Sequence, residues 1–167
     1  MTTLEIELAI SNFLDPRRYM IVPNIWWGMG LNHECDIFAV SKTGYVTEVE
    51  IKINRYDLKR DRRKSHAHGS KLIRRLFFAI PESLIPFIGY IQEEAGVIVV
   101  NETEWAGTCR LTRAATMNKM ARPLLEKELN HLGRLAAMRI WSLKRTLIDR
   151  KHNTDQFIVT YEGLTTL

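Results

Sequence analysis

Residues 34–53 constrain the fold of this chain more than any other segment, because they contain two strand-like stretches joined by a short polar turn. Along residues 45–53, the side chains of Glu48, Glu50 and Lys52 alternate with mostly apolar ones. This two-residue period is typical of a β-strand with two different faces. Residues 35–40 form the other stretch. The pattern predicts a β-hairpin whose second strand carries acids and a lysine on one face.

The hairpin also predicts a pair of carboxylates. If the turn centres near Thr43, Asp36 lies opposite Glu50, with Cβ atoms about 5 Å apart. Two carboxylates at that separation repel each other unless a cation lies between them. The alternative is an ordinary solvent-exposed sheet face, on which alternating charges are normal. Asp36 argues against it, because residues 37–40 beside it are apolar and a buried acid needs a partner.

These residues predict a site for divalent-metal phosphodiester chemistry. Asp36, Glu50 and the carbonyl oxygen of Ile51 offer the oxygen ligands that Mg²⁺ or Mn²⁺ prefers. We expect Lys52 to stay protonated beside the carboxylates, where it can orient the attacking water and stabilise charge in the transition state. A bound metal ion would lower the pKa of that water. Glu48 shares the strand face and is the alternative acid.

The N-terminal segment supplies one more candidate. Thr2 or Thr3 can cap a helix that runs to about Phe13 and stops at the Asp-Pro pair of residues 15–16. Glu7 falls in the middle of the apolar arc of this helix, where a carboxylate is costly unless it is paired. We therefore expect Glu7 to assist the metal site. The alternative is that Glu7 reaches the helix edge or pairs with an arginine.

Positive charge concentrates directly after the hairpin. The chain has a net charge of +5, whereas residues 55–75 alone carry nine basic and two acidic side chains. Such a run is either a solvated helix face or a surface that follows the phosphate backbone of DNA without reading bases. Its place directly after the candidate site favours the second interpretation. The expected DNA-binding residues are Arg55, Lys59, Arg60, Arg62, Arg63, Lys64, His66, His68 and Lys71.

The whole pattern predicts an α/β fold in one domain. The expected order is a helix, three strands, a helix over residues 56–75, strands at 76–80 and 96–100 separated by a short helix, a long helix over 123–149, and a strand-like piece at 157–161. We expect residues 1–110 to form the core and residues 111–167 to form a C-terminal helical extension packed on the same domain. The basic side of this extension could face DNA or form a homodimer.

The residues described above resemble the PD-(D/E)XK nuclease superfamily. Its helix acid, its Asp and its Glu-x-Lys element on a hairpin correspond to Glu7, Asp36 and residues 50–52. The resemblance is strongest to phage- and prophage-borne members and to the MmcB-like DNA-repair group. Cys35 stands where the family usually has a proline. The resemblance implies a restriction-endonuclease-like αβββαβ core, with a mixed central sheet flanked by helices, and Mg²⁺-dependent DNA cleavage.

The expected function is therefore metal-dependent hydrolysis of DNA phosphodiester bonds in phage or bacterial DNA processing or repair. One alternative is a catalytically inactive DNA-binding module of the same fold, and another is an RNA-associated or assembly protein that oligomerises through the long helix. No Gly-rich phosphate loop is present, so we expect no nucleotide cofactor. No signal peptide and no apolar run of about 18 residues are recognisable. We therefore expect a cytoplasmic protein with no membrane partner.

Overall fold

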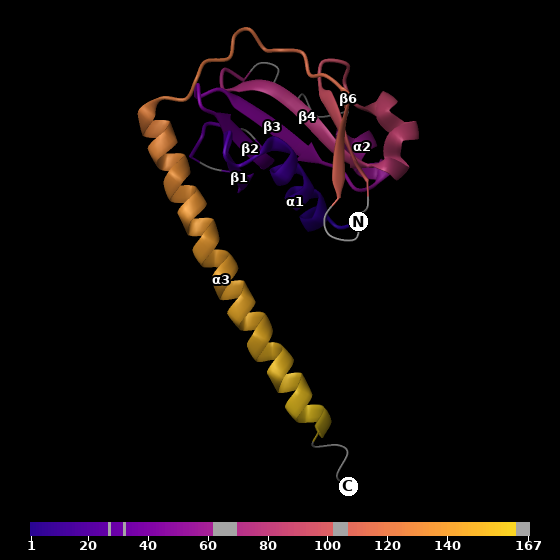
Figure 1. The fold of residues 1–167 in the computed structure, drawn as a ribbon, viewed down its shortest axis with the longest axis vertical. Coiled ribbons are helices and arrows are strands. Elements are labelled where there is room, and N and C mark those ends of the chain that lie inside the picture. The colour runs from indigo at the N-terminus through magenta and orange to yellow at the C-terminus, as the bar shows by residue number, and fades with distance from the viewer. Residues whose placement is uncertain (27, 32, 62–69, 102–106, 163–167) are drawn as a thin grey trace. The chain divides into compact units, whose positions relative to one another are not determined.

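The computed structural model describes every residue except 27, 32, 62–69, 102–106 and 163–167. Figure 1 shows the order of the elements along the chain. They are α1 (Thr3–Leu14), β1 (Tyr19–Ile25), β2 (Cys35–Ser41), β3 (Val46–Ile51), α2 (Arg55–Asp61), β4 (Ile73–Pro81), the 3-10 helix η1 (Glu82–Tyr90), β5 (Gly96–Asn101), β6 (Thr108–Arg113) and α3 (Glu126–Glu162).

The strands form one six-stranded mixed sheet in the order β1-β2-β3-β4-β5-β6. The β1–β2, β2–β3 and β5–β6 pairs are antiparallel, and the β3–β4 and β4–β5 pairs are parallel. The succession α1, β1 to β3, α2, β4 is the predicted αβββαβ core. The predicted fold class, a mixed sheet flanked by helices with a long C-terminal helix, is therefore confirmed.

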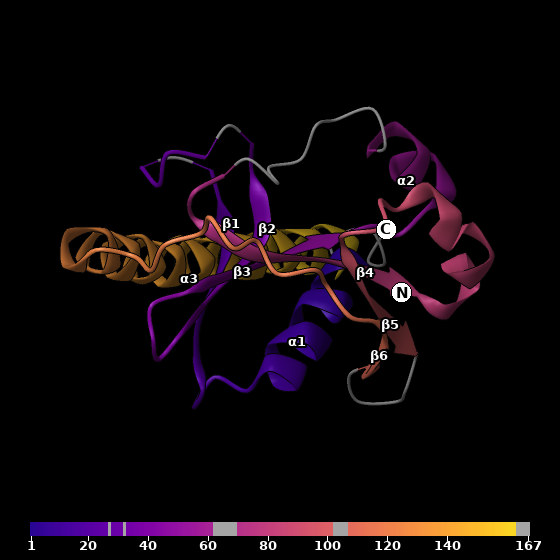
Figure 2. The same cartoon turned by 90° about the horizontal axis from the view of Figure 1, so that it is seen from above.

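Helices cover both faces of the sheet, as Figure 2 shows for α1 on one side and α2 on the other. On the first face, Ile6, Ala9 and Ile10 of α1 pack in one apolar cluster with Val49 and Ile51 of β3. The opposite cluster joins α2 and η1 to strands β4 and β5. Its residues are Leu58, Leu76, Phe78, Ile80, Leu84, Ile91, Ala95, Val97 and Val99. The core thus lies in two layers on either side of the strands.

Helix α1 begins and ends where the sequence predicts. The Thr2 side chain accepts a hydrogen bond from the backbone N–H of Glu5, and the Glu5 carboxylate accepts one from the backbone N–H of Thr2. This capping box satisfies two N–H groups that the helix leaves without internal partners. Asp15 caps the other end. Glu5 therefore acts at the exposed helix terminus, whereas Glu7 faces inward.

The turn between β2 and β3 sets the register of the hairpin. Gly44 donates its N–H to the Ser41 carbonyl at 2.9 Å and has a φ of 80°, a conformation that costs glycine little. A Cβ at Gly44 would lie 3.1 Å from Cβ of Pro123. The Gly44 carbonyl accepts a hydrogen bond from the Leu124 N–H at 2.9 Å. The segment that follows β6 therefore packs against this turn.

Two expectations about secondary structure were wrong, and one strand had not been predicted. Of the predicted helix over 56–75, residues 56–61 lie in α2 and residues 73–75 belong to β4, whereas residues 62–69 lie outside the described residues. Residues 108–113, which were not assigned to an element, form the edge strand β6. The strand-like piece at 157–161 is helical and lies within α3.

The chain divides into two compact units, Met1–Leu129 and Asn130–Leu167. The expected boundary at residue 110 falls inside β6, so the first unit extends past it. Packing of the C-terminal helix on the core and the formation of a homodimer stay predictions. Over the described part of the chain, none of the helices has the length and apolar character that a membrane span requires.

Candidate functional site

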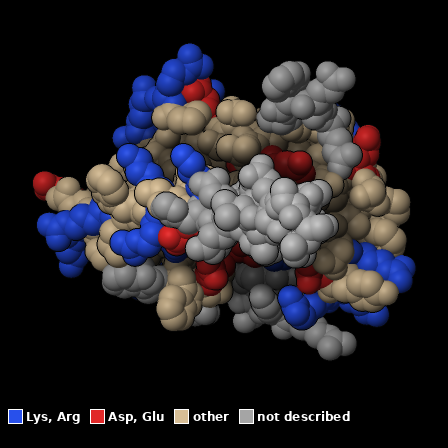
Figure 3. All heavy atoms as spheres, turned by 90° about the horizontal axis from the view of Figure 1, so that it is seen from below, with Lys and Arg blue, Asp and Glu red and all other residues tan. Residues whose placement is uncertain are grey.

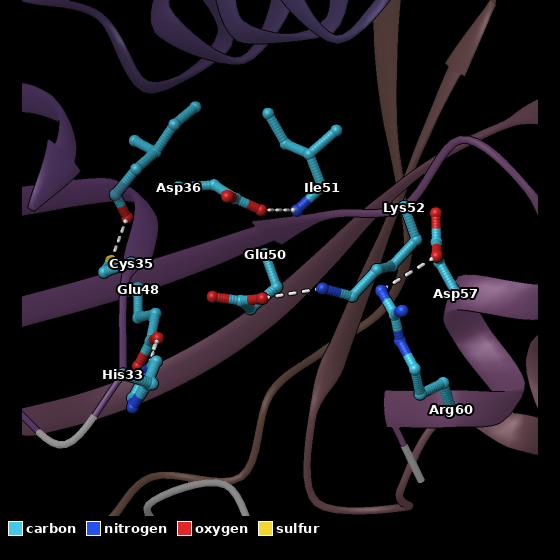
Figure 4. Close-up of polar contacts among 10 residues, drawn as sticks. His33, Cys35, Asp36, Glu48, Glu50, Ile51, Lys52, Asp57 and Arg60 are labelled. Carbon is cyan, nitrogen blue, oxygen red and sulfur yellow. Dashed lines mark hydrogen bonds and ion pairs between the residues drawn. The ribbon is translucent and has the colours of Figure 1, made fainter. Parts of the chain in front are cut away.

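The β2–β3 register brings Asp36 to the position predicted for it. Ile37 pairs with Val49 and Phe38 with Glu48, so Asp36 is next in line with Glu50. Oδ2 of Asp36 accepts a hydrogen bond from the backbone N–H of Ile51 at 2.7 Å, as Figure 4 shows. The Asp36 side chain thus supplies a partner for a strand N–H group at the end of the β2–β3 ladder, and this contact holds its carboxylate beside β3.

The charged residues of β3 lie on the sheet face opposite α1. Glu48 is aligned with Leu76 and Glu50 with Phe78 of β4, both of which belong to the apolar cluster under α2. The exposed fractions are 1% for Glu48, 4% for Glu50 and 9% for Lys52. The solvent-exposed sheet face considered as an alternative is therefore excluded. Three ionisable groups this deeply buried need opposite charges close to them.

Lys52 directly neutralises one of these acids. Its Nζ donates to Oε2 of Glu50 at 2.7 Å and lies 5.9 Å from the centre of the Phe78 ring. The backbone N–H of Lys52 bonds to the Ala79 carbonyl at 3.0 Å, so the β3–β4 pairing continues past the end of β3. This bond holds the Lys52 backbone, and the ammonium group of the side chain is directed at the Glu50 carboxylate (Figure 4).

Electrostatic interactions connect Glu7 to the same group. Burial raises the pKa of Asp36, and the nearby Glu50 carboxylate raises it further, while the Ile51 N–H and Lys52 lower it. Burial also raises the pKa of the half-buried Glu7, with Asp36 as the second cause, against a hydrogen bond from the Asn24 side chain. The structure therefore brings together the four predicted side chains, from α1, β2 and the end of β3.

His33 was missed as a member of this site. It lies just before β2, and its Nε2 makes a hydrogen bond with Oε1 of Glu48 (Figure 4). One ligand atom each from His33, Glu48 and Glu50 lie within 4.8 Å of one another. Glu48, the alternative acid, is thus part of a possible metal-ligand group, whereas Asp36 is not. Hairpin pairing could not indicate His33, because the residue lies outside the ladder.

Cys35 occupies the position before Asp36 and belongs to the buried core. It is fully buried, and its Sγ donates to the Ile37 carbonyl at 3.1 Å. Burial raises the pKa of this thiol well above its usual value, and the charges of Glu48, Glu50 and Asp36 raise it further. Cys35 is therefore an un-ionised, structural thiol in a region of concentrated negative charge.

The predicted DNA-binding residues are only partly described. Arg62, Arg63, Lys64, His66 and His68 lie outside the described residues. Lys71 precedes β4 and is exposed, and Arg55, Lys59 and Arg60 of α2 are also exposed. Arg60 pairs with Asp57 at 3.2 Å, and the Arg55 guanidinium stacks on Tyr56 at 4.9 Å.

Basic side chains also occur elsewhere on the surface. Figure 3 shows Lys and Arg side chains in several groups on one face, with acidic side chains among them. Arg74, counted in the basic run but located in β4, stacks on the Tyr45 ring at 3.7 Å. The exposed cations of α2 follow directly after Lys52 in the chain, which is where a phosphate-contacting surface is expected.

Comparison with known proteins supports a DNA-related role. The family described as DNA repair protein MmcB-like matches residues 1–147. Among solved structures, a protein of unknown function from Silicibacter pomeroyi has a similar fold, with a TM-score of 0.61 and 16% sequence identity over 90% of this chain and 94% of that one. No curated protein matches the chain. From the family match, which covers most of its length, the chain belongs to the MmcB-like DNA repair protein family.

Proposed function

We propose that this protein is a PD-(D/E)XK-type nuclease that hydrolyses DNA phosphodiester bonds with the help of Mg²⁺ or Mn²⁺. The observation that supports this most directly is the meeting of Asp36 and Glu50 at one end of the sheet, with the Lys52 ammonium 2.7 Å from Glu50. Two carboxylates and a lysine from adjacent strands are a combination suited to charge stabilisation during phosphodiester cleavage.

The residues present fit a hard divalent cation. Asp36 and Glu50 offer carboxylate oxygens, and their mutual repulsion is one of the causes that raise the pKa of Asp36. A cation between them would remove that repulsion. Asp36 and Glu50 would hold the ion, with the Ile51 carbonyl as a further oxygen ligand and Glu7 close to Asp36. The chemistry that such an ion supplies is neutralisation of phosphate charge and a lower pKa for bound water.

Lys52 acts as a cation in this proposal. Its contact with Glu50 favours the charged ammonium, since an adjacent carboxylate stabilises a proton on the amine. A charged Lys52 cannot accept a proton from water, so its role is to orient the attacking water and to stabilise the negative charge that develops on the phosphate. Burial to 9% exposure strengthens both effects, because little solvent screens the ammonium.

The family and the surface both support DNA as the substrate. The family description concerns DNA repair, and the exposed cations of α2 come directly after the candidate catalytic residues in the chain. Contacts from Lys59 and Lys71 to phosphates would position a strand without selecting its sequence. We therefore propose that the activity serves bacterial or phage DNA processing or repair.

The deciding experiment is incubation of the protein with single-stranded, duplex, flap and branched DNA, in Mg²⁺, in Mn²⁺ and in EDTA. We expect cleavage of at least one substrate with metal, none in EDTA, and none by the Asp36→Asn variant. Glu34→Gln, a change at an exposed neighbouring acid, is the matched control and should cleave normally. If the wild-type protein binds DNA but cuts no substrate under any of these conditions, the protein is a DNA-binding module and the nuclease proposal is wrong.

A further inference from the structure

A second group of possible metal ligands adjoins the Asp36 carboxylate and shares Glu50 with it. Its members are His33, from the segment before β2, and Glu48 and Glu50, from β3. Their ligand atoms lie within 4.8 Å of one another, close enough for all three to bind a single ion. In Figure 4 the His33 ring and the Glu48 carboxylate lie together on the same side of β3 as Glu50.

The two buried carboxylates at this position favour the binding of a cation. Glu48 and Glu50 project from the same strand face and are 1% and 4% exposed, so solvent screens neither carboxylate. Lys52 provides one positive charge, through its 2.7 Å contact with Glu50. Glu48 is in contact with the His33 imidazole. A divalent ion held by all three residues would place positive charge beside both carboxylates.

A small pocket lies beside Glu48. Glu48 contributes to its wall together with Arg75 and Leu76 of β4 and with Asn118. Asn118 is held there by two hydrogen bonds from its Nδ2, to the carbonyls of Ser70 at 2.9 Å and Ile73 at 3.0 Å. The pocket wall beside Glu48 therefore includes a polar side chain whose amide is already fixed.

We propose that His33, Glu48 and Glu50 bind a divalent transition-metal ion, with Mn²⁺ preferred over Mg²⁺. An imidazole nitrogen is a poor ligand for Mg²⁺, which takes oxygen, and a better one for first-row transition metals. On binding, the ion takes the place of the proton between Nε2 of His33 and Oε1 of Glu48, and that proton is released to solvent. This inference rests on the proposed function, because the two sites share Glu50, and it gives that function a metal selectivity set by one histidine.

The test is pulsed electron paramagnetic resonance of Mn²⁺ bound to the full-length protein, without DNA. A coordinated imidazole gives a ¹⁴N modulation of the electron spin echo, and we expect this signal in the wild-type protein. His33→Gln should abolish the signal and weaken Mn²⁺ binding at least about ten-fold, with a smaller effect on Mg²⁺ binding. Glu34→Gln, the exposed control, should change neither property. Asp36→Asn should keep the nitrogen signal.

The wild-type spectrum makes the test independent of whether a variant folds. Absence of nitrogen modulation from wild-type Mn²⁺ protein would overturn the inference, as would a signal that persists in His33→Gln. Neither result would affect the nuclease proposal if Mg²⁺-dependent cleavage is observed. Conversely, a protein that cuts no DNA but shows the nitrogen signal, lost in His33→Gln, would end the nuclease proposal and support the metal site.

Discussion

The two faces of β3 are equally buried but chemically opposite. On the face toward α1, Val49 and Ile51 pack in an apolar cluster. On the other face, Glu48 and Glu50 are as little exposed as those apolar residues. Burial of apolar area stabilises a fold, whereas burial of charge at best breaks even. The difference indicates that the first face stabilises the fold, and it is the reason for proposing that the second face binds a metal ion.

The largest effect should come from removing the cation of the charged face. In Lys52→Ala we expect DNA cleavage to fall at least about 100-fold, because charge stabilisation in the transition state is lost, while DNA affinity stays nearly unchanged. Lys42→Ala removes an exposed lysine in the β2–β3 turn and serves as the control. Single-turnover cleavage and a separate DNA-binding titration measure the two quantities. Cleavage by Lys52→Ala at the wild-type rate would remove the catalytic interpretation of this face.

A second prediction concerns the stability of the same ion pair, measured in EDTA. Lys52→Met should lower the free energy of unfolding by about 3 kcal/mol, because it leaves the buried Glu50 carboxylate without its ammonium partner. The double variant Glu50→Leu with Lys52→Met should recover to within about 1 kcal/mol of the wild-type value or exceed it. Urea unfolding of the single and double variants decides this. A double variant as unstable as Lys52→Met would mean that the charged face contributes to folding.

A substitution on the apolar face should lower stability and leave activity unchanged. Val49→Ala removes two methyl groups from a fully buried position and should cost about 2 kcal/mol of unfolding free energy. Cleavage per folded molecule should be unchanged, since Val49 lies on the face of β3 opposite to Glu48 and Glu50. Thermal unfolding and active-site titration test the two halves. A loss of activity without a loss of stability would contradict the division between the faces.

The smallest effect is a dependence of stability on pH. Asp36 has an ordinary pKa of 3.8, which is raised in the folded protein. Between those two values the folded state binds more protons than the unfolded state, so this carboxyl makes stability fall as pH rises. The unfolding free energy of Asp36→Asn should therefore rise relative to that of the wild-type protein as the pH increases from below 3.8. The difference should persist above the raised pKa. Urea unfolding across a pH series, in EDTA so that no metal ion neutralises the carboxylates, should show this change in the difference between the two proteins. Stability curves of the two proteins that run parallel across the pH series would contradict the prediction.

Local sequence signals were sufficient for the hairpin and the first helix. The alternation along β3, with a turn around Thr43, correctly placed Asp36 in line with Glu50. The cap residue Thr2 correctly placed the start of α1. Both depend on interactions between residues close in the chain, which composition and spacing reveal.

The remaining features depend on contacts that local patterns do not encode. His33 approaches Glu48 because the chain bends before β2, outside the period of the strand. The piece at 157–161 has a strand-like composition, but it continues the helix α3, so helix continuation overrode β-propensity. Basic composition at 73–75 suggested a helix face, whereas pairing with β3 made these residues part of β4.

The packing of the β2–β3 turn against the segment after β6 has a practical consequence for shortened proteins. The Gly44 carbonyl receives its hydrogen bond from Leu124, and two contacts of 2.7 and 2.8 Å join the Arg122 guanidinium to the Glu128 carboxylate beyond it. A truncation at residue 110 would cut through the edge strand β6 and would remove the segment that packs against the β2–β3 turn. We therefore expect shortened versions of this protein to fold only if they retain the segment that follows β6, so expression trials should not stop at residue 110.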